Sequence, residues 1–146
     1  EPGPGGGTPD VLATVDTSAQ ATTSGGALIF NDTPLISGNS ITHQAGSSEV
    51  NITQPGIYQA TFQGTVSVNA GTTIPAPITV QLELNGAPVS GAIARQTFTS
   101  SSEVSTLNFS APFRINSIPA NLRVVVGQSG FTFEEAALTV VRLGDA

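Results

Sequence analysis

The chain has 146 residues, which suits one domain, and it carries ten acidic residues, four arginines and no lysine, for a formal net charge of −6. So few cations exclude the clustered Lys and Arg that bind nucleic-acid phosphates or anionic membranes. The lack of cysteine excludes disulfides, thiolate metal sites and a cysteine nucleophile. Only 10% of residues are charged, and the resulting surface tolerates contact with other subunits because few charges must be desolvated.

The first ten residues, EPGPGGGTPD, are mostly Gly and Pro and predict no globular packing. Gly3 and Gly6 are three residues apart, as at the end of a Gly-X-Y collagen repeat, in which only Gly fits the crowded axis. A flexible linker would have the same composition. We therefore expect a Gly/Pro-rich linker at 1–10, which could end a collagen-like stalk, and one head domain at 11–146. The start at Glu1, without Met, is interpreted as that of a fragment or processed chain.

The first part of the domain predicts short strands separated by polar turns. These strands are 11–15, 27–30 and 49–53. Residues 35–48 are rich in Ser, Gly and Asn, which indicates a loop with at most a short edge strand.

The clearest strand signal is the strict alternation of apolar and polar residues at 57–68 and again at 78–84. Such alternation is typical of a strand with one buried face. Asn85-Gly86 follows the second strand and favours a tight hairpin turn, so residues 89–98 should return antiparallel to it.

The rest of the chain predicts further short strands. They are 103–109, with an extension at 112–115, then 121–126, 131–133 and 136–143. The total is about eight to ten strands with a turn every ~8–12 residues, which is typical of an antiparallel β-sandwich or jelly roll. We predict an all-β fold.

Two late segments, VVV at 124–126 and LTVVRL at 138–143, are apolar on both faces. One face of a sandwich strand packs in the core, so the other needs a cover. A partner subunit is one such cover, and a loop of the same chain is the other. These segments do not show whether the odd- or the even-numbered residues of the strands face a partner.

No reaction centre is predicted. His43 is the single histidine and lies in a polar segment, ITHQAGSS, which indicates a solvated loop residue. Glu134-Glu135 is the one adjacent acidic pair, and neighbouring strand residues should point to opposite faces. A calcium site at Glu134, Glu135 or Asp32 would lack the dense Asp/Asn/Gly ladder of a dedicated loop. We expect no enzyme activity, no metal and no cofactor.

Several blocks follow one another in a characteristic order: IFNDTPLISGNSIT at 29–42, EVNITQPGIYQATFQGTVSV at 49–68, ITVQLELNGAPVSG at 78–91, and the closing NLRVVV and ALTVVRL. In order and spacing they resemble the C-terminal domain of BclA-type collagen-like glycoproteins of bacterial spore surfaces. Together they cover roughly residues 27–143. That family is part of the jelly-roll superfamily of complement globular heads and tumour-necrosis-factor ligands.

The resemblance implies a jelly roll of about ten strands, packed as a homotrimer at the outer tip of a collagen-like stalk on a spore exosporium or cell surface. Together with the closing segments that are apolar on both faces, it makes the following residues candidates for the trimer interface: Val124, Val126, Leu138, Val140, Tyr58 and Phe62. A host receptor or a glycan is a second candidate partner, because the same domain could be an adhesin tip. A phage fibre or capsid-decoration head of the same fold is a further alternative.

Overall fold

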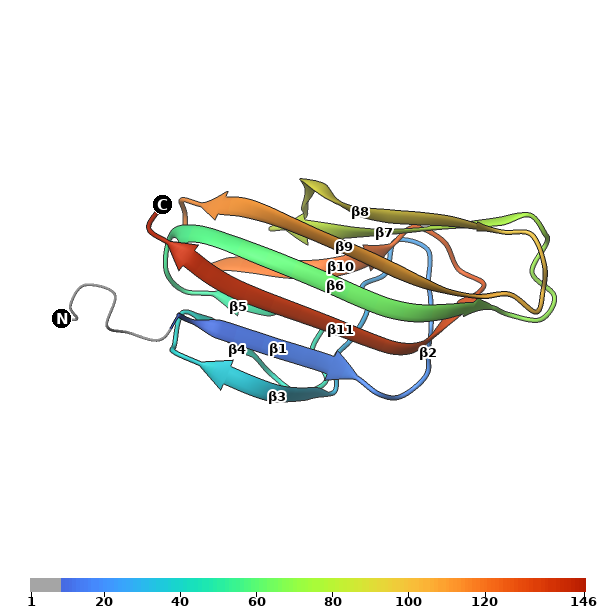
Figure 1. The fold of residues 1–146 in the computed structure, drawn as a ribbon, viewed down its shortest axis with the longest axis horizontal. Helices are drawn as coiled ribbons and strands as arrows, with labels where there is room; N and C mark the ends of the chain where they lie inside the picture. The colour runs from blue at the N-terminus through green and yellow to red at the C-terminus, as the bar shows by residue number, and fades with distance from the viewer. Residues whose placement is uncertain (1–8) are drawn as a thin grey trace.

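A computed structural model describes residues 9–146 and forms a sandwich of two antiparallel sheets (Figure 1). Sheet A has the order β3-β1-β11-β6-β9, with the short β2 also paired to β11, and sheet B has the order β4-β5-β10-β7-β8. This is the predicted all-β sandwich, with eleven strands rather than about ten. Among the described residues there is no helix long and apolar enough to cross a membrane.

The strands range from two to fourteen residues. In chain order they are β1 Val11–Asp16, β2 Gln20–Ala21, β3 Asp32–Ser37, β4 Ile41–His43, β5 Val50–Ile52, β6 Gly56–Val68, β7 Ala76–Leu84, β8 Ala87–Phe98, β9 Val104–Ile115, β10 Ala120–Val126 and β11 Phe131–Gly144.

The alternating segments form strands as predicted. Every second side chain of β6 is buried, from Gly56 to Val68. Asn85 and Gly86 both have positive φ, 52° and 85°, and join β7 to β8 through the Leu84↔Ala87 pair. Those angles suit a type I′ turn, whose twist matches that of the flanking strands.

The segment between β1 and β4 differs from the prediction. Residues 27–30 form one isolated bridge, Ala27↔Val125, instead of a strand. Leu28 and Phe30 are nevertheless buried, and the Leu28 amide donates to the Val124 carbonyl at 2.9 Å. The apolar residues of this segment therefore indicated burial rather than a strand. Residues 35–48, expected to be a loop with a short edge strand, contain the end of β3 and all of β4, which are edge strands of the two sheets. The start of β3 was not predicted, because most of its side chains are exposed.

The strand β11 is continuous where two strands were predicted. Its pairing with β6 shifts between Phe133 and Glu135, which marks a β-bulge. Phe133 and Ala136 both point into the core, so Glu134 and Glu135 share one outward position. The expectation that these two acids point to opposite faces is wrong, because a bulge inserts one extra residue and breaks the alternation.

Aromatic rings fill the space between the sheets. Phe62 stacks on Phe109 with ring centroids 5.3 Å apart and meets Phe133 edge-on at 6.2 Å. Gly64 makes this packing possible, since a Cβ there would lie 2.8 Å from the Phe133 ring. Near one end of the sandwich, Phe98 of sheet B contacts Phe131 of sheet A at 5.5 Å.

The domain begins beside the place where it ends. Val11 of β1 pairs with Val141 of β11, and the Arg142 amide donates to the Asp10 carbonyl at 2.9 Å. The predicted linker at 1–10 lies mostly outside the described residues, which start at Pro9.

Candidate subunit interface

The six residues that the sequence singled out as interface candidates all lie in the core of a single chain. Each side chain is at most 1% exposed. The six are Val124, Val126, Leu138, Val140, Tyr58 and Phe62. A side chain without exposed surface does not contact a partner while its own subunit stays folded. A subunit interface must therefore use the side chains of opposite parity, which point away from the core.

On sheet A, the outward side chains of the long strands form a broad surface, which we call the A face. Its centre consists of three cross-strand rows, each running from β3 to β9. The rows are Ser37, Val11, Val141, Gln59 and Pro112; then Leu35, Ala13, Thr139, Thr61 and Ser110; then Asp32, Val15, Ala137, Gln63 and Asn108.

Asp32, the exposed β3 end of the third row, is the one charged residue in these rows, and none lies on the central strands β1, β11 and β6. On the strands that form the face, charges occur toward its two ends, with Arg114 beside Ile57 at one end and Glu134 and Glu135 at the β11 bulge toward the other. Thr61 and Gln59 each hydrogen-bond Ser110, at 2.9 and 2.8 Å, so the polar groups there partly satisfy one another. Such a surface loses little solvation when a partner covers it.

Sheet B presents a different outward surface, the B face. Arg123 lies opposite Glu83 with 3.8 Å between the charged atoms, and Arg95 lies opposite Thr79. Val125 is apolar and points outward, but it is half-buried between Gln81 and the bridging Ala27. A loop of the same chain thus flanks the one apolar outward residue of β10.

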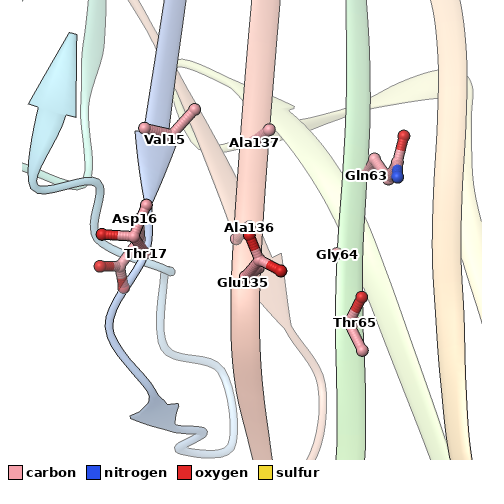
Figure 2. Close-up of a pocket in the computed structure, with 9 residues that line it drawn as sticks. All are labelled: Val15, Asp16, Thr17, Gln63, Gly64, Thr65, Glu135, Ala136 and Ala137. Carbon is pink, nitrogen blue, oxygen red and sulfur yellow. The ribbon is translucent and has the colours of Figure 1, made fainter. Parts of the chain in front are cut away.

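A pocket of about 250 Å³ opens on the A face next to the β11 bulge (Figure 2). Nine residues from the end of β1, the middle of β6 and the bulge line it: Val15, Asp16, Thr17, Gln63, Gly64, Thr65, Glu135, Ala136 and Ala137. Asp16 is buried and accepts hydrogen bonds from the Ser18 amide at 3.2 Å and from Gln20 Nε2 at 2.5 Å. The Glu135 side chain is exposed.

His43 is not a solvated loop residue. It ends β4, is half-buried and packs edge-on against Phe30. Its Nε2 lies 3.0 Å from the Ser47 carbonyl and its Nδ1 lies 2.8 Å from the Thr33 hydroxyl. Because a carbonyl only accepts, Nε2 carries the proton and Nδ1 accepts from Thr33, so both ring nitrogens serve the structure. Within residues 9–146, no three His, Asp or Glu side chains gather as a metal site would require.

No protein-family model and no curated protein matches the sequence. Solved structures do match it in fold. The globular domain of zebrafish complement 1qA protein has a TM-score of 0.71 at 12% identity, over 94% of this chain and 99% of that one. The Eiger TNF of S. frugiperda has a TM-score of 0.66 at 13% identity, over 95% and 96% of the two chains. The vertex protein P5 of PRD1 has a TM-score of 0.63 at 16% identity, over 94% and 99%.

These likenesses span nearly the full length of both chains in each case. They confirm the complement- and tumour-necrosis-factor-like jelly roll that the resemblance implied. The described chain is an eleven-strand jelly roll of that fold, with a broad, centrally uncharged outer surface on sheet A.

Proposed function

We propose that this domain is the homotrimerisation head of a collagen-like bacterial surface protein, displayed at the outer tip of its stalk. The observation that carries the proposal is the A face, where three rows whose only charged member is Asp32, at the β3 edge, lie side by side across long strands. Its members include half-buried Val11, Val141 and Ala137, none of which is needed to complete the core. Apolar side chains that gather on an outward face are typical of interaction sites.

A closed ring offers a way to cover this face in every copy. The strands β8 and β9, each of twelve residues, form one open edge of the sandwich, and each pairs with a neighbour on one side only. Open edges expose unpaired backbone groups that invite further contacts. If the β8–β9 edge of one copy packs on the A face of the next, three copies close a ring and leave neither surface free.

The stalk supplies the reason for such a head. Three collagen chains must meet in register before a triple helix can form, and each Gly-X-Y chain alone has no internal hydrogen bonds. A head that trimerises first makes stalk association intramolecular, at an effective concentration in the ~mM range. The Gly/Pro-rich lead-in and the BclA-type resemblance favour an extracellular site, on a spore exosporium or cell surface.

The proposal is tested by the folding of a stalk. Gly-Pro-Pro triplets are added before Glu1, and triple-helix formation is followed by circular dichroism in the wild-type chain and in Thr61→Asp. Thr61 lies at the centre of the A face, so the charge should prevent trimerisation. We expect a fast helix with a concentration-independent rate on the wild-type head, and a slow, concentration-dependent one on the variant. Equal rates on both heads would contradict the proposal.

A receptor- or glycan-binding adhesin tip is the alternative, in which the trimer serves avidity. None of the chain's aromatic rings is exposed: Phe113 is half-buried and stacks on Tyr58, and the others are buried. Glycan recognition here would therefore depend on hydroxyl and amide groups rather than ring stacking. Binding of a monomeric Thr61→Asp variant and of the wild-type chain to immobilised glycans separates adhesion from assembly.

A phage fibre or capsid-decoration head is a further candidate. The likeness to the PRD1 vertex protein P5, which covers nearly all of both chains, supports it. Both the collagen and the phage candidate require the same assembly through the A face, so the stalk experiment gives the same result for each. The sequence upstream of the domain separates them, because the collagen proposal alone requires dozens of Gly-X-Y triplets there.

A further inference from the structure

The pocket on the A face is acidic, and no basic residue lines it. Two of its nine lining residues are acidic, Asp16 and Glu135. Asp16 has only amide donors as partners. Among residues 9–146, Glu135 has no salt-bridge partner. Covering this pocket with a subunit that brings no cation would bury the Glu135 carboxylate unpaired, which is costly.

The chain has four basic residues apart from His43, all of them arginines, so the candidates are few. Arg123 pairs with Glu83 at 3.8 Å, and Arg142 pairs with Asp145 at 3.2 Å. Arg95 and Arg114 are exposed and have no acidic partner within the described part of the chain.

Position along the strands separates these two arginines. Phe98 and Phe131 touch, with centroids 5.5 Å apart, and provide a common reference level. Arg95 lies three residues from Phe98 along β8, and Glu135 lies opposite Thr65, three residues along β6 from the partner of Phe131. Both are therefore about 10 Å from the reference level, at ~3.3 Å per residue. Arg114 lies opposite Ile57, eight residues from Thr65 and thus about 26 Å from the level of Glu135.

Arg95 and Glu135 do not meet within one chain. Arg95 points outward from β8, the edge strand of sheet B, whereas the pocket opens on the outer face of sheet A. In a ring whose axis is parallel to the strands, rotation from one copy to the next does not change the position of any residue along that axis. In such a ring the β8 edge of one copy brings Arg95 to the height of the next copy's pocket.

We propose that, in the trimer inferred above, the pocket beside Glu135 receives the Arg95 guanidinium of the neighbouring subunit. This inference rests on the proposed trimerisation and adds the residue that sets the rotational register of the ring. The cavity of about 250 Å³ exceeds several water volumes of ~30 Å³ and admits a planar guanidinium. The heterologous geometry repeats the ion pair at all three interfaces.

Substitution of each partner measures the pair. Arg95→Gln and Glu135→Gln should each weaken every interface by roughly 3- to 5-fold. Three equivalent interfaces multiply this to roughly a 30- to 100-fold fall in the trimer association constant. The swap Arg95→Glu with Glu135→Arg should restore assembly to within about 5-fold of wild type. Sedimentation equilibrium over a dilution series measures all of these constants.

Arg114→Gln is the matched control. It removes another exposed arginine without a salt-bridge partner among residues 9–146, and that arginine lies about 26 Å along the strands from the level of Glu135. It should leave the association constant within about 3-fold of wild type. If Arg95→Gln and Glu135→Gln behave like Arg114→Gln while the protein remains trimeric, the ion pair is refuted and the assembly proposal stands. A monomeric wild-type chain would instead refute the assembly, and the pair with it.

A cross-linking experiment tests proximity without relying on energies. The chain has no cysteine, so Arg95→Cys with Glu135→Cys creates the only two thiols. A short bismaleimide should then link the double variant into a covalent trimer on a denaturing gel. The single-cysteine variants and the pair Arg114→Cys with Glu135→Cys should not form that trimer. A trimeric double variant that gives no cross-linked product would overturn the inference.

Discussion

The two outer faces of the sandwich are built from the same kind of alternating strands, yet they differ in chemistry. The B face carries Arg123, Glu83 and Arg95 among its outward side chains, and Arg123 and Glu83 neutralise each other. The three central rows of the A face carry only Asp32, at the β3 edge, and their hydroxyls and amides bond to one another.

This difference in charge indicates which outer face of the sandwich suits contact with a partner subunit. Both sheets pack against the same core, and sheet B does so while carrying charges on its outer face, so the absence of charge at the centre of the A face is not a requirement of folding. Charge costs a folded subunit nothing on a face that stays wet, but it costs several kcal/mol where a partner excludes water. The centre of the A face thus has the composition of a covered surface, and the B face that of a solvent-exposed one apart from Arg95 on its edge strand β8.

The largest effect is expected from a charge in the core. Leu138 is 1% exposed and packs between the sheets, so Leu138→Asp should lower the free energy of unfolding by at least ~4 kcal/mol. Chemical denaturation followed by circular dichroism measures it. A variant that keeps wild-type stability and loses only its partners would place Leu138 in the interface, contrary to the structure.

A charge at the centre of the A face should act on assembly alone. Thr61 is exposed in the subunit, so Thr61→Asp should shift its free energy of unfolding by less than ~1 kcal/mol while weakening each interface by about 2 kcal/mol. The matched control is Thr42→Asp, an exposed strand threonine on sheet B. If both variants assemble equally well, the contrast between the faces has no functional meaning.

Gly64 lines the pocket, and the packing of aromatic rings beneath it requires that this residue has no side chain. A Cβ at Gly64 would lie 2.8 Å from Phe133 and 2.9 Å from Phe62, so Gly64→Ala should destabilise the subunit by roughly 1 to 2 kcal/mol. Thermal unfolding checks this against Gly144→Ala, where no atom lies within 4 Å of the new methyl group. An unchanged melting temperature for Gly64→Ala would contradict the tight aromatic packing.

The smallest effect should come from the charge pair of the B face. Arg123 and Glu83 lie 3.8 Å apart with side chains 37% and 23% exposed, so Glu83→Gln should cost no more than ~0.5 kcal/mol. Assembly should be unaffected. Loss of trimers in this variant, measured by sedimentation, would show that the B face takes part in subunit contacts beyond Arg95 at its β8 edge.

Strict alternation made much of the fold predictable. The strands β6 and β7 and the Asn85-Gly86 hairpin followed directly from periodicity and turn chemistry. The strand β3 did not, because Leu35 and Ile36 are both exposed on an edge and leave no one-sided pattern. The apolar run at 27–30 suggested a strand, but its burial needs only a single bridge to β10.

The sequence predicted that the closing strands need a cover, but it did not predict which residues would form the interface. Three identical residues, as in VVV at 124–126, do not show which of them face the core. In the structure Val124 and Val126 are buried in the core, whereas Val125 points outward. In the last strand a signal was present: Thr139 sits between Leu138 and Val140, and the polar residue marks the outward side. The strict pattern around Tyr58 and Phe62 likewise indicated a core face. The pocket depends on the β11 bulge, which the spacing of residues did not reveal.

The central claim is that the A face is covered by another copy of the chain. Sedimentation equilibrium of the wild-type chain at micromolar concentration, beside Thr61→Asp, tests it most directly. The account predicts three times the chain mass of 14.7 kDa for the wild type and a single chain mass for a folded variant. A wild-type protein that sediments as one chain, with its A face open to solvent, would contradict it.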